Sequence, residues 1–322
     1  MATSTFHVPG ILDIQKVTNQ CVENTGWFPG YPLILKLSSI LPFSIHDLAP
    51  WVSKVLFFIS IVLFGKVSNT LNFNFKNAVF MLIPAFWFGF IYFNNAFPNS
   101  TILFFILLAF YSYMSDKKGL LYFSCVMASL AYPTGFLVSV VVSATMFLYS
   151  KEVLKKRLHA VIPSIFGFIG LALFFLYLHY EVGDWEAFLK IQNKYNHGLH
   201  NPLVNIRDKF RGFSFDFSQG GNSIILQSAT ILMLYILSSI YFFRKQLYKS
   251  QVYLLSFAFF TIYLAFPWIV GGDLSIYRSE ALLLPAAILY KEVSPRINII
   301  LVSVLLFFGA VMGHLFFIDV LQ

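Results

Sequence analysis

The chain has 322 residues, of which 58% are hydrophobic and 11% are charged. A soluble domain carries roughly 25% charged residues, so this composition excludes an ordinary soluble globular protein and predicts a polytopic membrane protein. The formal net charge of +8 does not indicate nucleic-acid binding, because the basic residues lie mostly in short breaks between apolar runs.

The first 48 residues predict an exoplasmic segment rather than a membrane span. Residues 1–25 lack a basic start and an apolar core, so we predict no cleavable signal peptide. In the stretch GWFPGYPLI, Pro29 and Pro32 each fix φ and remove a backbone donor, which predicts a turn and not a helix interior. The following run at 33–43 is too short to span and predicts a helix lying in the membrane interface.

Ten apolar runs predict an all-α fold, a polytopic helical bundle with about ten transmembrane helices besides the short interfacial helix. Each run is long enough, or nearly so, to cross ~30 Å of hydrocarbon at about 1.5 Å per residue. The predicted spans are 49–66, 78–97, 99–114, 119–132, 134–150, 159–180, 222–243, 250–271, 275–290 and 297–317. This divides the chain into the exoplasmic segment 1–48, a first bundle 49–180, an exoplasmic loop 181–221 and a second bundle 222–322.

The loops between these spans form two alternating sets, and one set holds most of the basic residues. That set is predicted to be cytoplasmic. Its basic residues are Lys66, Lys76, Lys117, Lys118, Lys151, Lys155, Lys156, Arg157, Arg244, Lys245, Lys249, Lys291 and Arg296. The other set, predicted to be exoplasmic, comprises 1–48, the breaks near Pro98 and Pro133, 181–221 and 272–274. A single broken helix over 119–150 is the alternative, and it would reverse the later topology.

Few residues suggest metal, redox or nucleotide chemistry. Cys21 and Cys125 are far apart and predict no disulfide framework. His197 and His200 are three residues apart but have no further ligand at metal-binding spacing. The chain has no dinucleotide, phosphate-loop or zinc-protease motif, and carboxylates are almost absent from the span interiors, which disfavours an ion-coupled pump.

Two segments on the predicted exoplasmic side carry polar residues of interest. Residues 184–194 predict an amphipathic surface helix with Trp185 and Phe188 on one side, preceded by Asp184 as a candidate cap. Arg278 lies at the start of the ninth predicted span, where a guanidinium could hold a phosphate through two hydrogen bonds. It could equally form an ion pair with Asp273 or Glu280.

Four segments, in this order, together resemble the GPI mannosyltransferase II family and its bacterial relatives. They are GWFPGYPLILKLSSIL, the stretch from AFPNST to AYPTGFL, GDWEAFLKIQ and YRSEALLLPAAIL. The family consists of multi-span glycosyltransferases of the GT-C class that use polyprenyl-phosphate sugars. One departure is Tyr132, which stands where the family's Arg-Pro-Thr-Gly motif has Arg.

The resemblance implies a GT-C-like fold and an inverting transfer of a sugar, with mannose as the expected sugar, from a polyprenyl or dolichyl phosphate to an exoplasmic acceptor. Asp13 would be the catalytic base, as the only Asp before the FPGYP segment, although it lacks the family's preceding Trp. Arg278 would bind the donor phosphate. Asp184 and Gln192 would shape the acceptor side or tether the loop helix, and the aromatic residues Trp27, Phe28 and Tyr31 would offer surface to lipid or sugar.

The family's N-terminal span and Trp-Asp loop are expected to be missing from this chain. The resemblance implies no cofactor, and a divalent metal ion remains compatible with it. The expected partners are the lipid-phosphate sugar, membrane lipid and a possible membrane-protein partner, in a bacterial inner membrane or the endoplasmic reticulum. Two alternatives stay open: a non-catalytic partner of a glycosyltransferase, and a lipid-linked polysaccharide polymerase or flippase.

Overall fold

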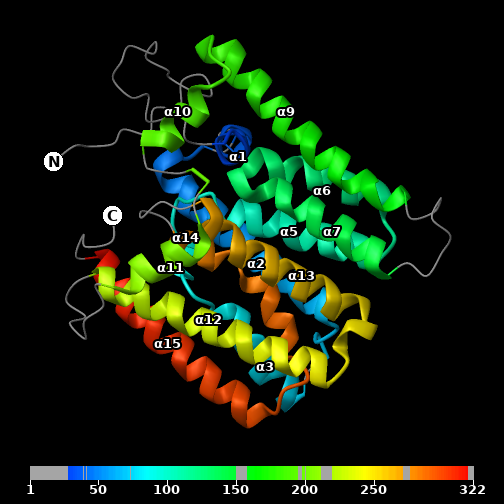
Figure 1. Cartoon of the computed structure of the whole chain (residues 1–322). Coiled ribbons are helices and arrows are strands. Elements are labelled where there is room, and N and C mark those ends of the chain that lie inside the picture. The colour runs from blue at the N-terminus through cyan, green and yellow to red at the C-terminus, as the bar shows by residue number, and fades with distance from the viewer. Residues whose placement is uncertain are drawn as a thin grey trace.

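The computed structural model is helical throughout the part of the chain that it describes, in agreement with the predicted all-α class (Figure 1). The described residues are 28–38, 40, 42–72, 74–149, 158–194, 198–199, 201–211, 220–270 and 276–317.

Within these residues, five helices are long and apolar enough to cross a membrane. They are α2 (Ile45–Ser68), α9 (Ile162–Val182), α12 (Gly220–Arg244), α13 (Gln251–Val270) and α15 (Pro295–Phe317). Many large apolar side chains on their outer faces are exposed, for example Phe58 of α2, Phe168 of α9 and Phe307 of α15. Exposed apolar surface on long helices is suited to lipid, so these helices indicate a membrane protein.

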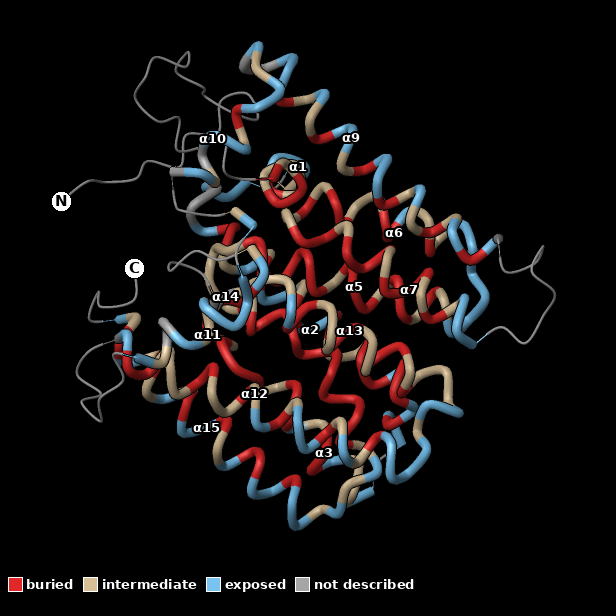
Figure 2. The backbone as a smooth tube through the Cα atoms, in the orientation of Figure 1, coloured by how far each residue is buried: buried red, intermediate tan, exposed pale blue. Residues whose placement is uncertain are grey.

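Four shorter apolar helices complete the bundle: α3 (Phe75–Ala85), α5 (Asn99–Met114), α6 (Lys118–Ala131) and α7 (Phe136–Tyr149). The 16 residues of α5 rise by about 24 Å, which is less than the hydrocarbon thickness. Most of α5 is buried, and the largest core cluster of the molecule surrounds it. Figure 2 shows the same pattern, with buried backbone in the centre and exposed backbone on the outer sides of α9 and α15.

Helices α6 and α7 form an antiparallel hairpin, joined by the short 3-10 turn η2 (Pro133–Gly135). Their contacts with α9 give the directions. Helices α6 and α9 run in the same direction, because their residue numbers increase together from the pair Tyr122–Phe166 to the pair Val126–Gly170. Helices α7 and α9 run in opposite directions, because Ser143 pairs with Ser164 and Ser139 pairs with Gly167. The two runs are therefore separate helices, as predicted, and not one broken helix over 119–150.

Two predicted spans are not continuous helices. The run 78–97 contains the end of α3, a turn at 86–90 and the single-turn helix α4 (Ile91–Asn94), and Gly89 in that turn has φ of 65°. The run 275–290 contains α14 (Ile276–Ala281) and the 3-10 helix η5 (Leu284–Tyr290). Every residue of η5 is buried. Irregular backbone at membrane depth is tolerated where protein surrounds it. A search for apolar runs cannot distinguish such a buried irregular segment from a continuous membrane-spanning helix.

Two further boundaries differ from the sequence prediction. The predicted interfacial helix begins earlier, because α1 (Gly30–Ser38) includes Pro32 in its first turn, where the missing N–H costs little. The predicted loop helix begins later, as α10 (Ala187–Lys194), and a second loop helix, α11 (Pro202–Phe210), follows it.

The loops gather at two ends of the bundle. Helices α10, α11 and α14 lie at one end, on the left of Figure 1, with α1 between α10 and α6, and we call this the loop-helix end. The opposite end, which we call the basic end, carries the turns at 69–72, 115–117, 245–250 and 291–294. Contacts between loops join members of the same predicted set: Lys76 meets Glu292 at the basic end, and the Gly198 N–H donates to the Val270 carbonyl at the other.

Candidate functional site at the loop-helix end

The FPGYP segment packs against the long loop that follows α9. The Phe28 ring stacks on Phe174 of α9, with centroids 3.7 Å apart, and meets the edge of Phe188 of α10 at 5.3 Å. The Tyr31 hydroxyl donates to the Ala49 carbonyl at 3.1 Å and lies 3.1 Å from the Ser53 hydroxyl. Phe28 and Tyr31 are both buried. They therefore fix the turn, and do not offer the ligand surface that the sequence had suggested.

The same segment touches the end of α6, just before the YPTG turn. Gly30 lies so close that an added Cβ would be 2.7 Å from the Ala131 Cα. Beyond that point, the Tyr263 hydroxyl of α13 donates to the Thr134 carbonyl at 2.8 Å. Three of the four segments that carry the family resemblance are thus neighbours, although they are far apart in the sequence.

Asp184 holds the start of the loop helix. Its Oδ1 accepts from the Glu186 N–H at 2.8 Å, and its Oδ2 accepts from the Lys190 ammonium at 2.7 Å. The hydrogen bond from Lys190 is the main cause that lowers the pKa of the Asp184 carboxyl. This is the capping role considered from the sequence. Gln192, one turn after Phe188, is half-buried on the same short helix.

The fourth segment, in α14, contains a buried carboxylate. Glu280 is 3% exposed. Its Oε1 accepts from the Ser228 hydroxyl at 2.5 Å, and its Oε2 accepts from the Gln227 amide at 2.8 Å. Its backbone carbonyl accepts from the Trp87 indole at 3.4 Å. Three hydrogen bonds from two other elements therefore hold α14, which also carries the backbone of Arg278 two residues earlier.

Sequence reasoning did not select the partners of Glu280. Besides Gln227 and Ser228, α12 buries Asn222 and Ser223 in its first turn. The available signal was the run NSIILQSA, in which polar residues recur after four or five positions within an apolar span. Ser223 and Gln227, which are four residues apart, lie on one side of a helix, so they predict a polar face directed into the bundle.

The predicted site residues are only partly placed by the structure. Asp13 and Trp27 lie outside the described residues, as do His197 and His200. The backbone of Arg278 lies in α14, but its side chain is not among those described. The proposed convergence of Asp13 and Arg278 on one ligand therefore stays a prediction. Within the described residues, no three His, Cys, Asp or Glu side chains are grouped to hold a metal ion.

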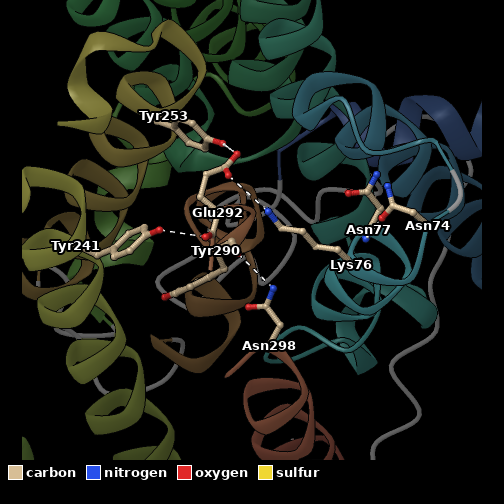
Figure 3. Close-up of polar contacts among 8 residues, drawn as sticks. All are labelled: Asn74, Lys76, Asn77, Tyr241, Tyr253, Tyr290, Glu292 and Asn298. Carbon is tan, nitrogen blue, oxygen red and sulfur yellow. Dashed lines mark hydrogen bonds and ion pairs between the residues drawn. The ribbon is translucent and has the colours of Figure 1, made fainter. Parts of the chain in front are cut away.

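A second polar cluster lies at the basic end (Figure 3). The Glu292 carboxylate accepts from the Tyr253 hydroxyl at 2.7 Å and lies 3.5 Å from the Lys76 ammonium, while its carbonyl accepts from the Tyr241 hydroxyl at 3.1 Å. The hydrogen bond from Tyr253 is the largest cause that lowers the pKa of Glu292. Because these contacts connect α3, α12 and α13 to the turn after η5, the cluster is a structural tie.

Comparison with protein-family models, with curated proteins and with solved structures finds no match to this chain. Its class follows from its own features: the described residues are helical, and five of their helices are long and apolar enough to cross a membrane, which indicates a helical membrane protein.

Proposed function

We propose that the protein is an integral-membrane glycosyltransferase that moves a sugar, mannose in the first instance, from a polyprenyl or dolichyl phosphate to an acceptor hydroxyl. The observation that supports this best is the shared location of the four resembling segments. The FPGYP segment contacts GDWEAF through Phe28 and Phe188 and contacts the residue before YPTG through Gly30 and Ala131, and α14 lies at the same end of the bundle (Figure 1).

The reaction assigns distinct roles to a carboxylate and a guanidinium. Asp13 takes the proton of the acceptor hydroxyl as its oxygen attacks the anomeric carbon. The bond between that carbon and the phosphate oxygen breaks, and the electron pair leaves with the polyprenyl phosphate. Arg278 binds this phosphate and stabilises the charge that grows on it. The product has the inverted anomeric configuration.

The distribution of charge supports an active face at the loop-helix end. Nine of the described basic residues lie at or beside the turns of the basic end: Lys66, Lys76, Lys117, Lys118, Arg244, Lys245, Lys249, Lys291 and Arg296. The positive-inside rule makes that end cytoplasmic, so α14 and the loop helices face the exoplasmic side. Lipid-phosphate sugars presented on that side would meet Arg278.

The experiment measures transfer of labelled mannose from polyprenyl-phosphate mannose by the protein in membranes. Arg278→Ala is compared with Arg296→Ala, which removes the same group from the basic end. We expect Arg278→Ala to lose at least 100-fold in kcat/KM, as for loss of a single preorganised donor to a developing oxyanion, and Arg296→Ala to stay near the parent. Equal activity of all three proteins would refute the assigned role of Arg278.

A second pair of variants tests the base. Asp13→Asn should abolish transfer, whereas Asp116→Asn, in a turn at the basic end, should leave it unchanged. A parent that is inactive alone and copurifies stoichiometrically with another membrane protein would instead support the non-catalytic partner.

A further inference from the structure

Glu280 fixes which way the Gln227 amide points. Because a carboxylate oxygen accepts hydrogen bonds, the amide nitrogen of Gln227 faces Glu280, at 2.8 Å. The amide oxygen must then point away from that contact. Gln227 is fully buried, and its Oε1 has no hydrogen-bond partner within the described part of the chain.

Ser223 repeats this feature one helical turn earlier. It is 1% exposed, and its Oγ also has no hydrogen-bond partner among the described residues. Residues four apart lie on the same face of a helix, so the Ser223 hydroxyl and the Gln227 amide share the face of α12 that carries the contact to Glu280. Ser223 lies near the first residue of α12, at the loop-helix end, and Gln227 lies deeper.

Buried polar atoms without a partner are rare in native proteins, and water, an ion or a ligand commonly completes them. The amide oxygen requires a hydrogen-bond donor, and the serine hydroxyl can donate or accept. A group that carries neighbouring hydroxyls satisfies both atoms. Glu280 preorganises this arrangement, since its hydrogen bond prevents the amide from turning over.

We propose that Ser223 and Gln227 form a subsite that binds hydroxyl groups of the sugar, with Glu280 as the residue that positions Gln227. This rests on the proposed function, and it adds the part of the site that recognises the sugar itself. The subsite on α12 contacts α14 through Glu280, which is two residues along the chain from Arg278, so the sugar and its phosphate would be held by neighbouring elements. The alternative occupant is a structural water that makes the same hydrogen bonds to Ser223 and Gln227.

Ser223→Ala removes one hydroxyl and leaves the Gln227–Glu280 contact in place. Its control is Ser239→Ala on the same helix, where the hydroxyl already donates to the Tyr235 carbonyl at 2.7 Å. Transfer is measured with polyprenyl-phosphate mannose and with the set of donors in which one sugar hydroxyl is replaced by hydrogen. We expect Ser223→Ala to lower kcat/KM for the mannose donor about tenfold, equivalent to about 1.4 kcal/mol. The loss should be smallest with the deoxy donor that lacks the hydroxyl bound by Ser223. Ser239→Ala should discriminate among the donors as the parent does.

The same proteins are tested for equilibrium binding of polyprenyl-phosphate mannose and of bare polyprenyl phosphate. The parent should prefer the sugar-bearing lipid, and Ser223→Ala should lose most of that preference. A folded parent that shows the preference without any transfer would refute the proposed function and leave the subsite standing. The subsite is refuted if Ser223→Ala prefers the sugar-bearing lipid as strongly as the parent does and ranks the deoxy donors by kcat/KM in the same order. In that case the two side chains hold only water.

Discussion

The substitution Gly30→Ala, which adds one methyl group, should force the FPGYP segment away from the α6–α7 hairpin against which it packs. A Cβ at Gly30 would lie 2.7 Å from the Ala131 Cα, 2.9 Å from the Ala131 nitrogen and 2.9 Å from the Leu130 carbonyl oxygen. Carbon atoms in favourable contact are about 3.5–4.0 Å apart, so α1 and α6 must move apart by roughly 1 Å. All three obstacles are backbone atoms, and no side-chain rotation can relieve them.

We expect Gly30→Ala to lower the free energy of unfolding by about 1–3 kcal/mol, the usual cost of overpacking. Denaturant titration in mixed micelles measures this loss. Gly221→Ala is the matched control, because Gly221 is also helical and an added Cβ there meets nothing within 4 Å. The control should be neutral or more stable by up to about 1 kcal/mol. If Gly30→Ala unfolds at the same denaturant concentration as the parent, the close approach of α1 to α6 is wrong.

Three other substitutions test named contacts in the same titration. Phe28→Ala removes the ring buried against α9 and α10, and it should cost about 3–5 kcal/mol; a loss below about 1 kcal/mol would contradict that burial. Tyr263→Phe removes the hydrogen bond to the Thr134 carbonyl and should cost about 0.5–1.5 kcal/mol, and an unchanged stability would show that this bond contributes nothing. The hydrogen bond from Tyr253 is the first cause that lowers the pKa of Glu292. The ionised Glu292 therefore stabilises the fold at pH values above the ordinary Glu pKa of about 4.3. That stability should disappear as the pH falls through the folded-state pKa, and Glu292→Gln should make the titration flatter in this acidic range; an identical pH dependence in both proteins would refute the assignment.

The sequence predicted the helical class and the separation of the loops into two sets, because both depend on composition along the chain. Apolar runs identify α2, α9, α12, α13 and α15, and the short YPTG break correctly predicted the hairpin of α6 and α7. Apolar runs failed at 78–97 and 275–290. There the backbone is irregular inside the protein, and its residues are as apolar as those of a lipid-facing helix.

The candidate site shows the corresponding limit for polar residues. Asp184 was recognised as a cap because its partners lie within a few residues of it. Glu280 was seen only as a possible partner for Arg278, since its observed partner Gln227 lies 53 positions away in the sequence. Phe28 was taken for exposed surface for the same reason, because the rings that bury it come from α9 and α10. Contacts between distant segments are set by the packing of the bundle, which no local pattern reports.

The most direct measurement is transfer of labelled sugar by the purified, folded protein in bilayers, with polyprenyl-phosphate mannose, glucose and N-acetylglucosamine supplied separately. The proposed function predicts that label leaves one of these donors, mannose first, for an acceptor hydroxyl, and that the product has inverted anomeric configuration. Retention of all label on all three lipids, by protein that still unfolds cooperatively, would contradict it.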